Sequence, residues 1–153
     1  AEWTPVGPSS YELLYRSGAG LTPRPLRRIA SGGELSRVML ASKVVLGNAD
    51  GVDTLVFDEV DAGVGGSTAR ALAGVLADLA STHQVIVVTH LAQVAVMADK
   101  HYVVSKEPGD VPQTHLDEVT GEARTAEIAR MLSGDQSEAS LAHAKQMLAE
   151  ARA

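Results

Sequence analysis

The chain has 153 residues, and its 45% hydrophobic and 21% charged residues are typical of one folded globular domain rather than a disordered segment. The absence of cysteine excludes a disulfide framework and a thiolate metal site, and is compatible with a reducing cytosol. The formal net charge of −6 argues against a nucleic-acid footprint spread over the whole chain. No apolar run approaches the roughly 20 residues of a membrane span.

The first ten residues are rich in proline, glycine and serine and predict an irregular lead-in. They lack both an initiator methionine and a signal-peptide pattern, so we expect the chain to be a fragment or a processed product. Residues 11–17 can form a strand, and a loop over 18–25 follows. A cluster of Arg24, Arg27 and Arg28 is more typical of a solvated loop than of a DNA site. We therefore take residues 1–30 as a lead-in strand and loop.

From Ser31 the spacing of apolar side chains becomes helical, and the pattern ends near Gly47. The predicted inner face of this helix carries Leu35, Val38, Met39, Ser42, Val45 and Leu46. TLVFDE (54–59) and QVIVVTH (84–90) are short apolar runs that predict strands buried on both faces. Between them, leucines and valine at positions 72, 75, 76 and 79 predict a helix.

The last third of the chain continues the alternation of helices and strands. We expect a short helix over 91–99, a strand over 101–106, a return strand over 114–119, and helices over 122–133 and 137–151. Strands that alternate with helices of this length indicate an α/β fold with a largely parallel core sheet.

The stretch SGGELSR (31–37) allows two readings. Ser31 followed three residues later by Glu34 is a capping box, in which each side chain bonds the backbone N–H of the other residue. That reading leaves Gly32 and Gly33 unexplained, because glycine in a first helical turn costs roughly 1 kcal/mol each in conformational entropy. A helix start with bare N–H groups is also an anion site. A pure cap and a phosphate contact remain equal alternatives on this local pattern.

Three polar residues end the two predicted core strands. Asp58 and Glu59 follow the first strand and His90 ends the second, so parallel pairing would bring them to the same sheet edge. Adjacent strand residues point to opposite faces, so one carboxylate could serve a hydrated Mg²⁺ and the other could deprotonate water. His90 could bond a phosphoryl oxygen. A solvated strand end and a structural histidine are the alternatives.

Taken together and in this order, SGGELSR, LVFDEVDAGVGG and VIVVTHLAQVA resemble the ATP-binding-cassette (ABC) heads of SMC-like chromosome proteins. They are similar to the signature motif, the Walker B strand with its glutamate and D-loop, and the switch histidine. Within this group the chain is most similar to the RecN family of DNA-repair proteins, through PRPLRRIASGGELSRVMLA and the final helices. Gly65 stands where most relatives outside that family have aspartate, which makes a transporter subunit less plausible.

The resemblance implies a nucleotide site shared by two heads, with ATP and Mg²⁺ as cofactors. Ser31, Gly32, Gly33 and Glu34 would contact the ATP of the partner head, and Asp61 and Gly63 would lie in the D-loop at the dimer seam. Asp58 would serve Mg²⁺, while Glu59 and His90 would be the catalytic residues. Arg37 would couple nucleotide contact to the rest of the head, or would be an ordinary exposed helix arginine.

A P-loop requires GxxxxGK[ST], and no lysine of this chain follows a glycine. The resemblance therefore implies that residues 31–153 are the C-terminal lobe of a head whose Walker A half and coiled coil lie elsewhere. Expected partners are that N-terminal half, a second head in an ATP-dependent homodimer, and DNA through the full-length protein, in the bacterial cytoplasm at the nucleoid. A non-catalytic ATP-capping module, or another SMC, RecF-type or transporter ATPase, is the alternative. Alone, the chain should not hydrolyse ATP.

Overall fold

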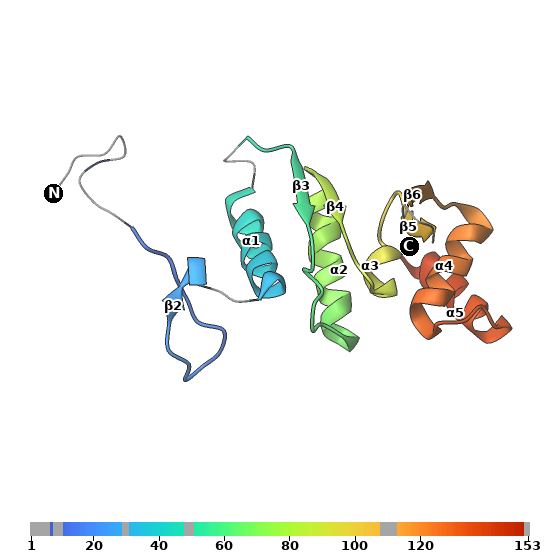
Figure 1. Cartoon of the computed structure of the whole chain (residues 1–153), viewed down its shortest axis with the longest axis horizontal. Helices are drawn as coiled ribbons and strands as arrows, with labels where there is room; N and C mark the ends of the chain where they lie inside the picture. Colours follow the sequence, from blue (N-terminus) through green and yellow to red (C-terminus); the bar gives the residue numbers. More distant parts are fainter. Residues whose placement is uncertain (1–6, 8–10, 29–30, 48–50, 108–112, 152–153) are drawn as a thin grey trace.

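A computed structural model describes residues 7, 11–28, 31–47, 51–107 and 113–151 of the chain. Its helices are α1 (Gly32–Leu46), α2 (Gly66–Ala80), α3 (Ala92–Ala95), α4 (Gly121–Ser133) and α5 (Glu138–Glu150), with a 3-10 turn, η1 (Leu26–Arg28). Its strands are β1 (Leu14–Tyr15), β2 (Arg24–Pro25), β3 (Thr54–Phe57), β4 (Gln84–Val87), β5 (Tyr102–Glu107) and β6 (Gln113–Glu118). Figure 1 shows α1, the β3–β4 pair with α2, then α3 and the α4–α5 pair following one another along the molecule.

The centre of the fold is a parallel pair of strands covered by one helix. Thr54 of β3 lies opposite Gln84 of β4, and the register continues to Phe57 opposite Val87. Helix α2 connects the two strands and packs on one face of the pair. A single apolar cluster joins them, consisting of Leu40, Leu55, Phe57, Val60, Leu72, Ala73, Leu76, Leu79 and Val94. The helical face predicted for α2 is therefore confirmed at Leu72, Leu76 and Leu79.

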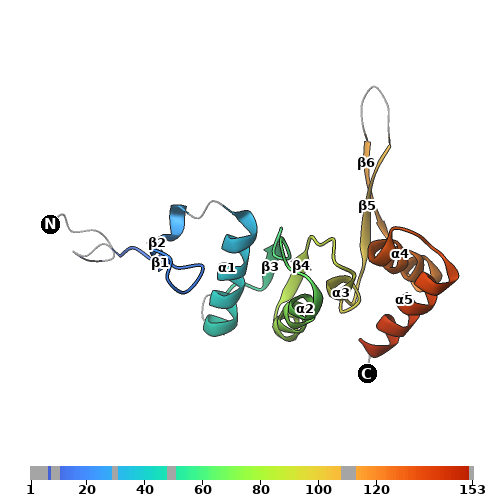
Figure 2. The same cartoon turned by 90° about the horizontal axis from the view of Figure 1, so that it is seen from below.

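The α/β class is confirmed, with parallel pairing confined to β3 and β4 among the described residues. The strands β1 and β2 pair antiparallel over two residues each, and β5 and β6 form an antiparallel hairpin that projects from the body in Figure 2. The predicted return strand over 114–119 is thus confirmed as β6. The core strands are shorter than predicted, because β3 ends at Phe57 and β4 at Val87.

Burial of the core strands on both faces is a wrong prediction for this chain. Leu55 and Phe57 are buried in the central cluster with residues of α1 and α2, whereas Val56, which points the opposite way, is 65% exposed. Ile86 of the second strand and Val88 just after it are exposed for the same reason, since they too point away from the central cluster. A run of apolar residues indicates that both faces of a strand avoid water. It does not indicate that this chain itself supplies the residues that pack on both faces.

The predicted inner face of α1 differs in the same way. Gly33 and Leu40 are its buried residues, while Met39 and Leu46 are exposed and Val45 is 85% exposed. Leu40 joins α1 to the central apolar cluster, while Leu35 and Met39 line a hollow between α1 and β3.

A second cluster lies at the C-terminal end, where α4 and α5 pack on α3. Ile128, Ala129 and Ala144 are fully buried there. The turn between the two helices is held by the carboxylate of Asp135, which accepts bonds from serines 133, 137 and 140; these bonds lower the pKa of Asp135 to about 2. Among the described residues, no helix is both long enough and apolar enough to cross a membrane.

Candidate nucleotide-contacting site

The parallel pairing of β3 and β4 brings the predicted polar residues to one edge of the sheet. The register ends with Phe57 opposite Val87, and the next backbone bond runs from Val88 N–H to the carbonyl of Phe57 (2.9 Å). Asp58 and Glu59 leave the first strand at the point where Thr89 and His90 leave the second. The prediction that Glu59 and His90 share an edge is confirmed.

The two carboxylates lie in a turn rather than on a strand. Because β3 ends at Phe57, the alternation of a strand does not set the directions of Asp58 and Glu59, and that part of the sequence reasoning does not apply. Glu59 adopts φ +55°, the left-handed region, and is the one non-glycine residue with positive φ among those described. Such a conformation costs on the order of 1 kcal/mol and persists only where its surroundings fix it.

The start of α1 packs directly against this turn. Gly33 is buried, and a Cβ there would lie 2.7 Å from the carbonyl oxygen of Glu59 and 2.8 Å from the Cβ of Ala62. A Cβ on Gly32 would lie 2.5 Å from Oε2 of Glu59. The capping box left both glycines unexplained, and close approach by a phosphate was one of the two alternatives for them. The structure shows that the chain's own Glu59 turn already makes that approach.

Two side chains of α1 fix the turn from its helical side. The Ser36 hydroxyl donates to the carbonyl of Asp58 (2.6 Å), and the Arg37 guanidinium donates to the carbonyls of Val60 (3.2 Å) and Ala62 (2.8 Å). Arg37 is therefore not an ordinary exposed arginine, since its Nη1 binds two backbone oxygens of the turn. At the helix start, Ser31 Oγ accepts from Glu34 N–H at 3.4 Å, which is the first half of the predicted capping box.

Replacing Gly33 or Gly32 with alanine tests separately how closely each glycine approaches the Glu59 turn. We expect Gly33→Ala to lower the free energy of unfolding by about 1–3 kcal/mol, because its Cβ meets backbone that must shift. Gly32→Ala should change it by less than about 1 kcal/mol, because its Cβ meets only the movable end of the Glu59 side chain. Urea unfolding followed by circular dichroism measures both. Equal losses for the two variants would contradict the close contact at Gly33.

Asp61 has surroundings that the sequence did not predict. It is 2% exposed, and its Oδ2 accepts from the Thr89 hydroxyl (2.5 Å) and from His90 N–H (3.1 Å). Its carboxylate thus binds the end of the neighbouring strand. The proposed location of Asp61 at a dimer seam stays a prediction, as does that of Gly63, whose φ of +71° lets the turn close at Val64. Thr89 was missed because its partner is 28 residues away.

The donor set at this edge suits part of a magnesium–nucleotide site. Asp58 is exposed and offers a carboxylate, the oxygen ligand that Mg²⁺ takes alongside water and substrate phosphates. No group of three potential metal ligands occurs among the described residues, so Asp58 would need further ligands from phosphate, water or another polypeptide. The N-terminus of α1 offers N–H groups and a positive dipole end to an anion.

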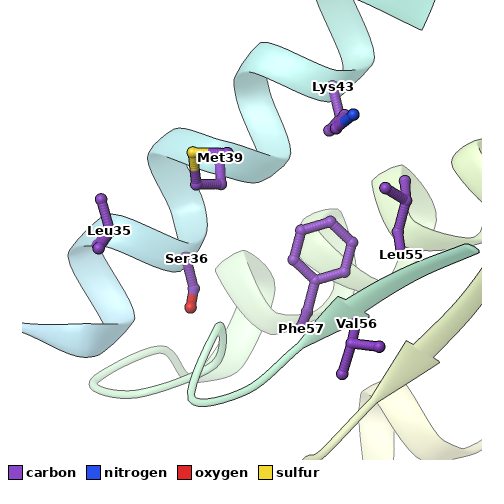
Figure 3. Close-up of a pocket in the computed structure, with 7 residues that line it drawn as sticks. All are labelled: Leu35, Ser36, Met39, Lys43, Leu55, Val56 and Phe57. Carbon is purple, nitrogen blue, oxygen red and sulfur yellow. The ribbon is translucent and has the colours of Figure 1, made fainter. Parts of the chain in front are cut away.

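A shallow hollow of about 250 Å³ lies between α1 and β3 (Figure 3). Its lining is mostly apolar and comprises Leu35, Ser36, Met39, Lys43, Leu55, Val56 and Phe57. Figure 3 shows that α1 contributes the first four residues and β3 the other three. The hollow opens on the exposed apolar face rather than on the polar edge, so its chemistry suits packing against another surface.

Comparison with known proteins gives consistent relatives. The chain is 52% identical to the DNA repair protein RecN of Treponema pallidum over 146 residues, which is 94% of this chain and 26% of that protein. It is 52% identical to RecN of Deinococcus radiodurans over 150 residues (97% and 26%) and 48% identical to RecN of Streptomyces coelicolor over 151 residues (97% and 26%). The chain thus spans about a quarter of the length of these relatives. No family model matches it.

The fold has a solved counterpart. A chain from work on the structural biochemistry of ATP-driven dimerization and DNA-stimulated activation of SMC ATPases matches with a TM-score of 0.53 and 21% identity, over 75% of this chain and 69% of the other. This likeness supports the fold of an SMC-type ABC head and nothing further. The relatives at about 50% identity match over nearly the whole chain and through their own C-terminal part. By sequence, the chain corresponds to the C-terminal part of RecN proteins.

Proposed function

We propose that residues 31–153 form the C-terminal lobe of a RecN-type ATPase head, with residues 1–30 as a lead-in, and that the full-length protein hydrolyses ATP in the repair of DNA double-strand breaks. One observation carries this proposal: the start of α1, the Glu59 turn and His90 meet at a single edge of the β3–β4 pair. An anion-binding helix start, a carboxylate that can position water and an imidazole are groups that can support phosphoryl transfer to water once a P-loop holds the nucleotide.

The roles of the site residues are those that the family resemblance implies, and the chemistry of each side chain suits its role. Glu59 orients and deprotonates the attacking water, and His90 contacts the γ-phosphate. Asp58 holds Mg²⁺ through its exposed carboxylate. Ser31, Gly32, Gly33 and Glu34 at the start of α1 face the ATP of a second head, so that each ATP-dependent homodimer has two shared sites. When bound, Mg²⁺ neutralises the phosphate oxygens.

The exposed apolar face is the proposed docking surface for the N-terminal half that carries the P-loop. It is defined by Leu35, Met39, Val56, Ile86 and Val88, all of which are at least 40% exposed. Val56 and Ile86 lie opposite each other in the β3–β4 register, and Leu35 and Met39 line the hollow between α1 and β3; exposed apolar groups of this kind are commonly covered by another protein surface. The sequence supplies no P-loop, so the ATP-binding loop must come from this partner.

Adding the P-loop half in trans tests this function. The chain alone should show no ATP turnover, and a mixture with the N-terminal half of a RecN relative should show turnover above either part. Val56→Asp on the docking surface should abolish complex formation and turnover, because it would bury an unpaired carboxylate. Val104→Asp, on the exposed strand β5 outside this surface, is the matched control and should retain both.

Two results would count against the proposal. Turnover by the chain alone would show that the P-loop half is unnecessary. A stable complex that binds ATP without turnover would favour the second candidate, a non-catalytic ATP-capping module, which the incomplete donor set at Asp58 would also permit. DNA contact is proposed only for the full-length protein, since the acidic chain offers just the arginines near residue 27.

A further inference from the structure

We propose that Asp61 is a positioning residue that fixes the ring of His90 in the tautomer protonated at Nδ1. This inference rests on the proposed contact of His90 with the nucleotide for its catalytic meaning, but the geometry itself does not depend on that contact. The side chain of His90 is 70% exposed and that of Asp61 is 2% exposed, so a buried carboxyl group lies behind an accessible imidazole.

The contacts around Asp61 converge on one oxygen. Its Oδ2 accepts from the Thr89 hydroxyl at 2.5 Å and from His90 N–H at 3.1 Å, and lies 3.3 Å from His90 Nδ1. All three partners come from the segment that follows β4. A buried carboxylate is costly unless donors surround it, so Asp61 holds this segment in the one arrangement that supplies them.

Thr89 makes the arrangement directional. Its Oγ1 accepts from Leu91 N–H at 3.0 Å, so the hydroxyl proton is directed to Asp61. The Thr89 hydroxyl and the His90 backbone N–H hold this segment beside Asp61, which places the exposed His90 ring with its Nδ1 3.3 Å from Oδ2. Leu91 is also the N-cap of α3, which anchors the far side of the segment.

The chemistry selects one tautomer of His90. An ionised carboxylate only accepts hydrogen bonds, so Asp61 Oδ2 at 3.3 Å favours the tautomer in which Nδ1 carries the proton. In a neutral imidazole the second nitrogen, Nε2, then accepts a bond from water; in the protonated ring Nε2–H can donate to a phosphoryl oxygen while Nδ1–H still faces Asp61. A third group that orients a catalytic imidazole is a recurrent arrangement in enzymes. Because Asp61 is two residues after Glu59, the same turn carries both the proposed base and the residue that orients the imidazole.

The experiment reads the tautomer directly. The 153-residue chain, labelled with ring-¹⁵N histidine, is examined by long-range ¹H–¹⁵N NMR at about pH 8, where an unperturbed imidazole is neutral. His90 is assigned by the loss of its signals in His90→Gln. We expect the Nδ1–H form to dominate for His90, and Asp61→Asn to shift the population toward Nε2–H because an amide can donate to Nδ1.

Thr89→Val is the matched control, because it removes a bond to Asp61 without touching the ring. It should leave the His90 tautomer unchanged. If the role of Asp61 were merely structural, Thr89→Val and Asp61→Asn would have the same effect on the tautomer. In the full-length protein, Asp61→Asn should lower ATP turnover by about 10- to 100-fold. If the full-length protein has no turnover, the proposed function fails while the tautomer still decides this inference.

A His90 ring that is mainly Nε2–H in the unaltered chain overturns the proposal, even if Asp61→Asn does not fold. The same holds if Asp61→Asn leaves the tautomer unchanged. A tautomer shift in Asp61→Asn together with an unchanged Thr89→Val supports it.

Discussion

Replacing Glu59 with glutamine should lower ATP turnover of the full-length protein by about 10²- to 10⁴-fold while leaving ATP binding intact. Glutamine keeps the size of the side chain and its contacts near Gly32, but it cannot accept the proton of the attacking water. The backbone at Glu59, with φ +55° and its carbonyl bonded by Ala62 N–H at 3.0 Å, is the same for either residue. The loss therefore falls on the chemical step.

Single-turnover hydrolysis and equilibrium ATP binding separate the two quantities. Glu118→Gln, on strand β6 and outside the proposed site, is the matched control and should turn over ATP at the rate of the unaltered protein. Retained turnover in Glu59→Gln would show that Glu59 does not catalyse hydrolysis and is only a structural residue of the turn. Loss of ATP binding would instead place its role in nucleotide contact.

Replacing Arg124 with methionine should lower the free energy of unfolding by about 2–4 kcal/mol. Arg124 is 8% exposed, and its Nη2 donates to the carbonyls of Ala95 (3.2 Å), Val96 (3.2 Å) and Ala98 (2.6 Å). These carbonyls lie at the C-terminal end of α3, where a cation also interacts favourably with the helix dipole. Methionine would fill much of the space and leave the buried carbonyls of Ala95 and Val96, and the partly buried carbonyl of Ala98, without this donor.

Urea unfolding of the chain measures this loss, and Arg130→Met on the same helix is the matched control. Arg130 is exposed and pairs with Glu127 one turn away, a bond that raises the pKa of Arg130 and lowers the pKa of Glu127. Exposed pairs of this kind contribute less than about 1 kcal/mol. Equal losses for the two variants would show that the buried carbonyl bonds of Arg124 add nothing beyond a surface ion pair.

Local patterns in the sequence predicted the elements well. The cap at Ser31 and the helix that follows depend on neighbours within four residues, so their signals are complete in the sequence. The common edge for Glu59 and His90 follows from parallel pairing alone, which the alternation of strands and helices indicates. Predicting these features required no knowledge of which elements pack against each other.

The contacts that build the site were beyond such reasoning. Arg37 binds carbonyls 23 and 25 residues away, and Thr89 binds Asp61 across 28 residues; no local pattern encodes these pairs. The exposure of Val56 was missed for a different reason. An apolar side chain indicates that its position avoids water, but the neighbouring sequence does not indicate which surface packs on it.

The strands β3 and β4 each pair along one side, and among the described residues no strand lies along the other. An unpaired edge presents a row of N–H and C=O groups that can bond any extended backbone. The exposed valines and isoleucine beside these edges make strand addition more favourable still. Until a further strand joins this sheet, copies of the chain can pair with one another. The free N–H and C=O groups at the edges of β3 and β4 could therefore pair with a further strand of the head or with another copy of this chain.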